Sequence, residues 1–173
     1  MTRRTPAPRF AVDWRTMSMT PEPVERGPQV IAHCIRVEAS AEELYAIIAN
    51  PHRHHELDGS GTVRTTAIGP RELQPGDRFR VDMRKYGIPY AITMHTTRAQ
   101  PHRVVEWRHP GGHRWRWELE PADDGGTLVT ESYDFSGQAA PLRKALEIAG
   151  VHRENDGGIR ASLQRLHDRF ASS

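Results

Sequence analysis

The chain has 173 residues, of which 36% are hydrophobic, and its formal net charge is +2. This composition predicts one domain with an ordinary core, and no apolar run approaches the ~20 residues that a transmembrane helix needs. Cys34 is the single cysteine, which excludes an internal disulfide and fits a reducing compartment. The basic N-terminus lacks the apolar segment of a secretory signal. We therefore expect a cytoplasmic protein without a membrane span.

The slight excess of positive charge does not indicate a nucleic-acid partner. Lys85 and Lys144 are the only lysines, so arginine carries nearly all of the positive charge. The arginines alternate with acidic residues, and strand pairing would place Arg116 opposite Glu106 on the outer face of a sheet. Such opposite-charge pairs are typical of a solvated sheet surface. We expect no nucleic acid among the partners.

Residues 1–28 differ from the rest of the chain because they are rich in proline and show little hydrophobic periodicity. Segments of this composition bury too little apolar surface to order themselves. We expect a mostly disordered or loosely docked N-terminal tail over residues 1–28, followed by a single domain over residues 29–173.

The domain is predicted to begin with a strand and two short helices. Val30–Val37 has the alternation of a strand. Ser40 and Glu43 have the spacing of a capping box, in which each side chain accepts a hydrogen bond from the other residue's backbone amide. The helix that they begin ends at Asn50–Pro51, and residues 52–58 are predicted to form a second short helix.

Consecutive antiparallel strands are predicted from Gly76 to Phe135, after a strand near Thr62–Ile68 and a loop over Gly69–Gly76. Apolar and polar residues alternate through this stretch, which is the period-2 signature of half-buried strands. The side chains that share the buried face are Phe79, Val81, Met83, Tyr90, Ile92, Met94, Val105, Trp107, Trp115, Trp117, Leu119, Val129, Glu131, Tyr133 and Phe135.

Two glycine-containing turns fix the expected register of these strands. A hairpin loop over residues 109–113 places Trp107 opposite Trp115. A second loop over residues 123–126 places Trp117 opposite Glu131 and Trp115 opposite Tyr133. One sheet face therefore carries three tryptophans, two tyrosines and one carboxylate.

Two helices are predicted after the sheet. Pro141 suits the first turn of a short helix that Gly150 ends. The last helix has an apolar stripe whose only available cover is the tryptophan face of the sheet, and the stripe consists of Ile159, Leu163, Leu166 and Phe170. The predicted fold class is α+β, with a curved antiparallel sheet of about six or seven strands wrapped around a long C-terminal helix.

The chain resembles the helix-grip fold of the START/Bet v 1-like (SRPBCC) superfamily, and in particular its polyketide cyclase/dehydrase-like branch. The resemblance covers roughly residues 29–171 and rests on fold-specific rather than catalytic motifs, which are Ile35–Ile48, Asn50–Pro51, Leu57–Gly61, Val105–Trp107, Gly126–Thr130 and Leu163–Leu166. It implies a cavity between sheet and helix for hydrophobic ligands. Many members have tryptophan where this chain has Leu57, a departure that would open or reshape the pocket wall.

The ligand cavity implied by this resemblance would be lined by core-facing residues of the sheet and the last helix. The expected ligand-binding residues are His33, Phe79, Val81, Tyr90, Ile92, Met94, Trp107, Trp115, Trp117, Glu131, Ile159 and Leu163. Flat aromatic side chains suit a flat or multi-ring ligand. The alternative is that the same side chains simply pack as a core beneath the helix.

Glu131 is the first candidate for chemistry, with Tyr133 beside it. A carboxylate on an apolar face is costly when ionised and unpaired, so it needs a partner or a raised pKa. A carboxyl of this kind suits a polar anchor or a general acid/base, and His33 on the first strand is its expected partner. The alternative places Glu131 at a solvated rim beside an arginine.

No metal or cofactor is expected. His52, His54 and His55 lack the i, i+4 spacing of a helical metal pair, and we expect them to be solvated at the mouth of the fold. His109 and His113 flank a hairpin, which is weak support for a metal site. Cys34 is expected to point away from the cavity, and no nucleophile triad or phosphate-binding loop is present.

Three functional hypotheses follow. The first is a binding protein that encloses a small hydrophobic molecule, aromatic or polyketide- or lipid-like. The second is a cofactor-independent polyketide aromatase/cyclase or dehydratase, a lyase in which Glu131, Tyr133 and Tyr90 assist proton transfer. The third is a protein-interaction module that uses the tail and the outer face of the sheet. A homodimer is also compatible with the sequence.

Overall fold

Eight antiparallel strands form one sheet in residues 19–171, the part of the chain that the computed structural model describes. The strands are β1 Glu22–Pro23, β2 Val30–Val37, β3 Val63–Ile68, β4 Arg78–Lys85, β5 Ile88–Gln100, β6 Val104–Arg108, β7 Arg114–Pro121 and β8 Thr127–Asp134. The helices are α1 Ala41–Ile48, the 3-10 helix η2 Pro51–Arg53, α2 His54–Leu57, α3 Ala140–Ile148 and α4 Val151–Ala171.

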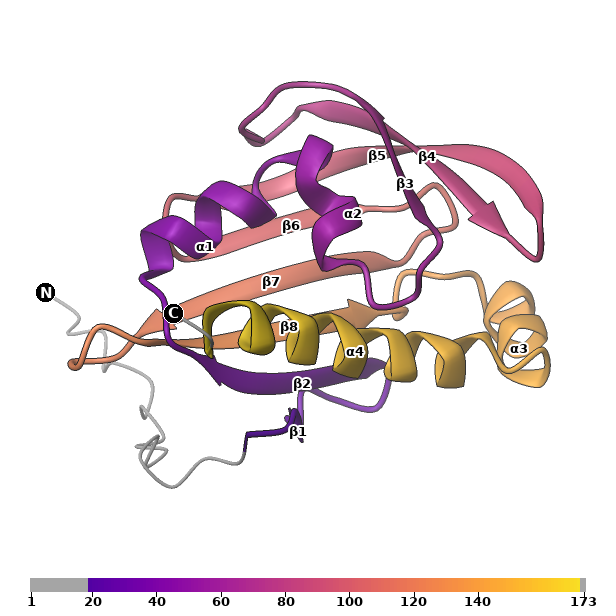
Figure 1. Ribbon diagram of the computed structural model, residues 1–173. Coiled ribbons are helices and arrows are strands. Elements are labelled where there is room, and N and C mark those ends of the chain that lie inside the picture. The colour runs from indigo at the N-terminus through magenta and orange to yellow at the C-terminus, as the bar shows by residue number, and fades with distance from the viewer. Residues whose placement is uncertain (1–18, 172–173) are drawn as a thin grey trace, which may run out of the picture.

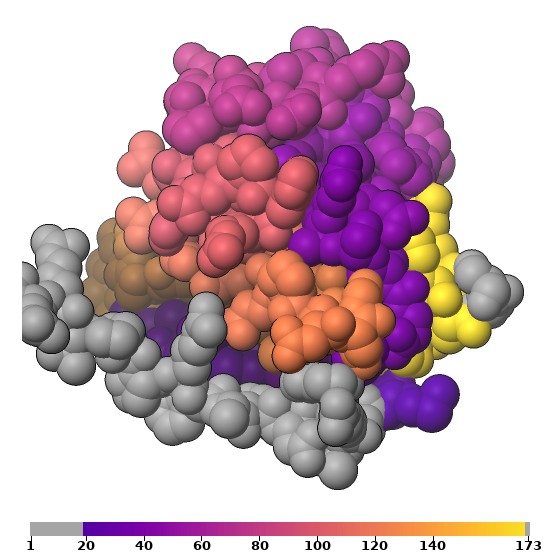
Figure 2. All heavy atoms as spheres, turned by 90° about the vertical axis from the view of Figure 1, so that its left-hand side faces the viewer, coloured from indigo at the N-terminus to yellow at the C-terminus, as the bar shows by residue number. Residues whose placement is uncertain are grey.

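The strand order is β1-β2-β8-β7-β6-β5-β4-β3, so the first long strand pairs with the last. The sheet curves around α4, while α1 and α2 lie over its middle strands (Figure 1). This arrangement confirms the predicted helix-grip fold. Figure 2 looks at the end of the molecule opposite α3, where α1 lies beside the β5–β6 and β7–β8 turns.

The predicted register of the central hairpins is confirmed. Trp107 on β6 pairs with Trp115 on β7, and on β8 Glu131 pairs with Trp117 and Tyr133 with Trp115. All of these side chains fall on the concave face because two-residue alternation is preserved across both turns.

The eighth strand is one more than expected and comes from the segment assigned to the tail. Glu22 pairs with Cys34 and Pro23 with His33, and the Val24 amide donates to the Ala32 carbonyl at 2.9 Å. This part of the expected tail is therefore docked on the sheet edge, where a proline costs no ladder hydrogen bond. Residues 1–18 lie outside the described part of the chain.

The capping box at the start of α1 is confirmed. Ser40 Oγ accepts from the Glu43 amide at 3.2 Å, and Glu43 Oε2 accepts from the Ser40 amide at 3.1 Å. The helix buries Leu44, Ile47 and Ile48 against the sheet. These contacts fix the start of the segment that carries α2 over the concave face.

The long helix α4 covers β2 and β8 with the apolar stripe expected from the sequence. Ile159, Leu163 and Leu166 are fully buried. Gly59 allows the loop after α2 to approach the helix, because a Cβ there would lie 2.3 Å from the Ser162 amide nitrogen. The Gly59 amide donates to Ser162 Oγ at 2.9 Å, which ties this loop to α4.

Candidate functional site

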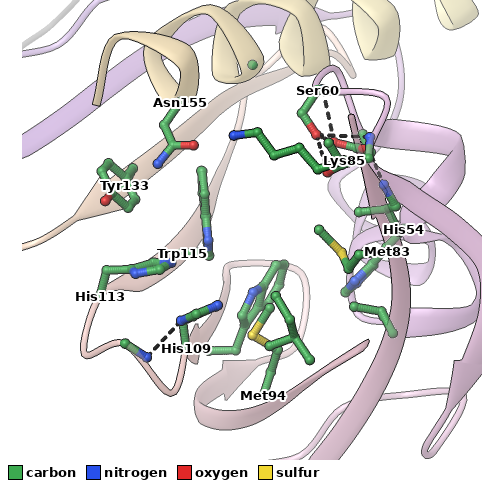
Figure 3. A pocket seen from close by; sticks show the side chains of 18 of the residues that line it. His54, Ser60, Met83, Lys85, Met94, His109, His113, Trp115, Tyr133 and Asn155 are labelled. Atoms are coloured by element: carbon green, nitrogen blue, oxygen red, sulfur yellow. Dashed lines mark hydrogen bonds between the residues drawn. The ribbon is translucent and has the colours of Figure 1, made fainter. Parts of the chain in front are cut away.

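A cavity of about 1200 Å³ lies between the concave face of the sheet and the helices. Its walls come from β4 to β8, from α2 and the loop after it, and from α3 and the first half of α4. Most of the exposed wall surface is apolar. Figure 3 shows aromatic, methionine and polar side chains from these separate elements converging on one space.

Most of the expected ligand-binding residues line this cavity, namely Phe79, Val81, Tyr90, Ile92, Met94, Trp107, Trp115, Trp117, Glu131 and Ile159. Tyr133, the second candidate for chemistry, also lies at its wall. The lining results directly from the alternation of β4 to β8, which directs every second side chain inward.

Two expected residues do not line the cavity. The His33 ring contacts α4 instead, where its Nε2 lies 2.7 Å from Asp156 Oδ1. Leu163, on α4, is fully buried in the core and does not line the cavity. Both expectations were wrong because sequence periodicity gives the face of an element but not which neighbour covers it.

His54 belongs to the cavity wall rather than to the solvated mouth that its sequence context predicted. Its ring stacks on Trp107 at 4.9 Å between centroids, and Phe79 meets it edge-on at 5.5 Å. Its Nε2 donates to the Ile48 carbonyl at 2.9 Å. Burial lowers the pKa of His54 to about 4, so the ring is neutral at physiological pH.

A second group of polar side chains lies around Tyr133. The Gln138 amide donates to His113 Nδ1 at 3.2 Å, and the His113 ring meets Tyr133 edge-on at 5.0 Å. The His109 ring stacks on the His113 ring, with 4.1 Å between the centroids, and its Nδ1 accepts a hydrogen bond from the Gly111 amide. Burial, with a smaller contribution from His109 and His152, lowers the pKa of His113 to about 3. We name Tyr133, Gln138, Asn155 and His113 the inner polar cluster.

This histidine pair does not form a metal centre with other ligands. No group of three or more His, Cys, Asp or Glu side chains in residues 19–171 is arranged to hold a metal ion. Each of the two rings also has its Nδ1 occupied by a hydrogen bond from the protein. Zinc sites need three or four converging ligands, which this hairpin does not supply.

Glu131 is a buried carboxyl at the cavity wall. Only 6% of the residue is exposed, and its Oε2 has no hydrogen-bond partner among the described residues. Burial raises the pKa of Glu131 well above its ordinary value, and the negative charge of Asp58 raises it further. Burial therefore favours the protonated form of this carboxyl, which can donate a hydrogen bond or a proton into the cavity.

The expected partnership between Glu131 and His33 is wrong, although the two residues pair across β2 and β8. His33 turns to Asp156, and its Nδ1, like Glu131 Oε2, is buried without a hydrogen-bond partner in the described chain. The alternative of a solvated rim is also wrong, because the carboxyl is buried.

Exposed residues of the cavity lining come from the β4–β5 turn, α3 and the start of α4, and we take them as the mouth of the cavity. These three segments lie at the same end of the molecule (Figure 1). Lys85 forms an ion pair with Glu154 on α4, and Tyr86 Oη donates to the same carboxylate at 2.9 Å. Tyr86 is 82% exposed and Leu142 on α3 is 41% exposed. We name Lys85, Tyr86 and Glu154 the mouth clasp.

Several lining residues were absent from the sequence-based set. His113 continues the alternation of Trp115 and Trp117, so its inward direction was available from the pattern of β7. Gln138 lies in an irregular loop, so its position carries no periodic signal. Asn155 lies four residues before Ile159, so extending the apolar stripe of α4 by one turn would have found it.

Comparison with known proteins identifies the family of this chain and several relatives. A family model described as "Polyketide cyclase / dehydrase and lipid transport" matches residues 28–171. An uncharacterised protein of Mycobacterium tuberculosis, Rv0088, is 43% identical over 155 residues, which cover 88% of this chain and 69% of that protein.

Solved structures share the fold at low sequence identity. The Zhui aromatase/cyclase from Streptomyces sp. R1128 matches with a TM-score of 0.58 and 19% identity, covering 81% of this chain and 94% of that one. A Rhodobacter sphaeroides protein matches with a TM-score of 0.63 and 18% identity, covering 88% and 99%. The di-domain aromatase/cyclase BexL, from the BE-7585A biosynthetic pathway, has a TM-score of 0.60 at 16% identity, with 84% of this chain and 47% of BexL covered.

Proposed function

Because this chain belongs to the polyketide cyclase / dehydrase and lipid transport family, we propose that it binds a small aromatic, hydrophobic molecule between the sheet and α4. The observation that carries the proposal is the cavity of about 1200 Å³ with Trp107, Trp115 and Trp117 in its wall. Ligand sites are typically apolar clefts with a few polar groups that fix orientation, and this cavity has that composition.

Tryptophan fluorescence tests the binding function, because three of the four tryptophans line the cavity. The fourth, Trp14, lies outside the described residues, so the full chain would carry Trp14→Phe to simplify the signal. We expect saturable quenching by polycyclic aromatics in a titration panel that also contains fatty acids and sterols. A response without saturation for every compound would contradict a ligand-binding cavity.

A cyclase activity is the second candidate, and the unpaired carboxyl of Glu131 inside the cavity favours it. In such a reaction an enol carbon of a poly-β-ketone attacks a carbonyl carbon of the same chain. The carbonyl oxygen takes the proton of Glu131 and becomes a hydroxyl, and the carboxylate recovers a proton from the enol hydroxyl. In the dehydration that follows, this hydroxyl takes a second proton from Glu131 and leaves as water, while the adjacent carbon loses a proton to the carboxylate and a C=C bond forms. Tyr133 and Tyr90 would hold the oxygens. Acid/base groups and a shaped cavity are sufficient for these steps.

Glu131→Gln separates the two candidates, because the amide keeps the shape of the side chain but has no acidic proton to transfer. Cyclisation of a synthetic linear poly-β-ketone, followed by the absorbance of the aromatic product, is expected to stop while binding of the product persists. Glu118→Gln is the matched control, since Glu118 pairs with Arg26 and Arg116 on the outer face. Full turnover by Glu131→Gln would eliminate Glu131 as the acid.

A further inference from the structure

We propose that the cavity takes an aromatic ligand that carries a positively charged nitrogen, and that the ionised carboxylate of Glu131 pairs with this charge. The inference rests on the proposed binding function and names the chemical class of the ligand. It follows from three features of the wall: the carboxyl of Glu131, the sign of the charges in the depth of the cavity, and the aromatic side chains beside them.

The first feature is the position of Glu131. The residue is only 6% exposed, it lines the cavity, and its Oε2 has no hydrogen-bond partner within residues 19–171. Its cross-strand neighbour His33 is bonded to Asp156 instead. Acidic side chains are rarely buried in native proteins unless a donor or a cation lies beside them. A carboxyl without such a neighbour at the wall of a ligand cavity indicates that the ligand supplies the partner.

The second feature is the sign of the charges around this carboxyl. Asp58 lines the same cavity, and its carboxylate is held at the wall by hydrogen bonds from the Val63 amide at 2.8 Å and from Ser60. Burial is the larger cause that opposes ionisation of Glu131 and raises its pKa, and the negative charge of Asp58 adds to it. A field that repels a second negative charge attracts a positive one.

The lysine and arginine side chains among the described lining residues lie away from this field. They are Lys85 and Arg84, and both lie at the β4–β5 turn. Lys85 pairs with Glu154, and Arg84 Nε donates to the Gly87 carbonyl of the same turn. Neither cation serves as a counter-ion in the depth of the cavity.

The histidines of the lining do not supply a positive charge either. Burial lowers the pKa of His54 to about 4, and burial, with a smaller contribution from neighbouring histidines, lowers that of His113 to about 3. Burial also lowers the pKa of His109. Near neutral pH these rings are uncharged, so a cation for the ionised form of Glu131 has to come with the ligand.

The third feature is the aromatic wall. Trp117 stands directly opposite Glu131 in the β7–β8 register, and both side chains line the cavity. Directly opposed residues of antiparallel strands have Cβ atoms about 4.5–5.5 Å apart. Trp107 and Trp115 extend the same wall. The face of an indole ring attracts a cation that lies within about 6 Å of the ring centroid, and the attraction is stronger where water is excluded.

The combination of a carboxylate with aromatic faces decides between ligand charges. An ammonium group loses its hydration on entry, so an ion pair alone would contribute little to affinity. The contact with Trp117 adds to that pair, and the pair also satisfies the buried carboxyl of Glu131. A carboxylate ligand would bring another negative charge beside Asp58 and Glu131 and would gain no counter-ion.

Isothermal titration calorimetry with three matched probes tests this charge selectivity on the full-length protein at pH 7. The probes are 2-naphthylmethylammonium, 2-naphthylmethanol and 2-naphthylacetate, which share one ring system and one methylene group and differ in the charge of the polar end. We expect the ammonium probe to bind about tenfold more tightly than the alcohol, in keeping with a cation–π contact away from water. We expect the acetate probe to bind about tenfold more weakly than the alcohol.

Glu131→Gln should reduce the ratio of the affinities for the ammonium and alcohol probes to about one, because the amide keeps the shape of the side chain and carries no charge. Glu118→Gln is the matched control, since Glu118 pairs with Arg26 and Arg116 on the outer face. The control variant should keep the wild-type ratio. A wild-type ratio in Glu131→Gln would overturn the inference.

The pH dependence of the wild-type protein gives a second measurement should Glu131→Gln fold poorly. Its probe is 2-naphthylmethyl-trimethylammonium, whose charge does not change with pH. The charged and titratable groups that face Glu131 are His33 on β2, Asp156 on α4, which is bonded to His33 and Arg160, and Asp58 in the loop after α2. Because rising pH ionises Glu131, the affinity for this probe should increase from pH 5 to pH 8, by at most about tenfold per pH unit. An affinity that does not increase would overturn the inference.

The outcomes separate this inference from the proposed function. An affinity for the alcohol probe equal to or above that for the ammonium probe, or tightest binding of the acetate probe, would overturn the charge selectivity and leave the binding function intact. Absence of binding for all three naphthalene probes would overturn both.

Discussion

At the scale of single residues, Glu131 couples the cavity to the stability of the fold. Burial raises the pKa of its carboxyl above the ordinary value of 4.5. Above pH 4.5 the folded chain therefore binds more protons at this site than the unfolded chain does. The contribution of Glu131 to the free energy of unfolding therefore falls as pH rises toward the pKa of its carboxyl in the folded chain, by at most about 1.4 kcal/mol per pH unit.

Glu131→Gln removes this proton linkage. We expect the free energy of unfolding of the variant, relative to wild type, to increase steadily from pH 4.5 upward, as measured by urea denaturation at a series of pH values. Glu118→Gln, which alters a carboxylate on the outer face, should not give this trend. A difference between Glu131→Gln and wild type that does not change with pH would mean that the carboxyl titrates normally.

At the scale of elements, the mouth clasp joins the β4–β5 turn to α4 across the opening of the cavity. Its three side chains all line the mouth, and Tyr86, which has a positive φ of 50°, donates a hydrogen bond to Glu154. The neighbouring helix α3 buries none of its residues, and Leu142 and Leu146 from it also line the mouth. Few contacts therefore hold the two sides of the opening together.

Glu154→Ala removes both bonds of the clasp. We expect faster dissociation of a bound aromatic probe in stopped-flow fluorescence, with little change in the midpoint of thermal unfolding, because exposed ion pairs contribute little to stability. Glu147→Ala is the control, since it removes a similar exposed pair with Lys144 within α3. Identical dissociation rates in the two variants would show that the clasp does not control access.

At the scale of the whole molecule, much of the fold could be predicted because its signals are local. Alternation identified the inward face of β4 to β8, and the short glycine-containing turns set the pairing of Trp107 with Trp115. The capping box of α1 and the apolar stripe of α4 are equally local patterns. The START-like resemblance then supplied the arrangement of these elements, which no local pattern contains.

The parts that could not be predicted depend on contacts between distant segments. His33 turns from the cavity because Asp156, far along the chain, lies against it. His54 enters the wall because α1 and α2 carry it over Trp107. Leu57 is buried at the cavity wall, a position that the family resemblance implied but that no local pattern indicates.

Some expectations about the whole protein stay predictions, namely the cytoplasmic location, the possible homodimer and any role of residues 1–18. The described residues contain no helix that is long and apolar enough to cross a membrane.

The most direct test of the cavity claim is two-dimensional NMR of the tryptophan indole N–H groups during a titration with 2-naphthol. Single Trp→Phe replacements would assign each signal. The account predicts that the signals of Trp107, Trp115 and Trp117 shift together and saturate at one equivalent of ligand, because all three side chains line the same space. Unchanged signals from these three indoles at saturating ligand would contradict a ligand cavity between the sheet and α4.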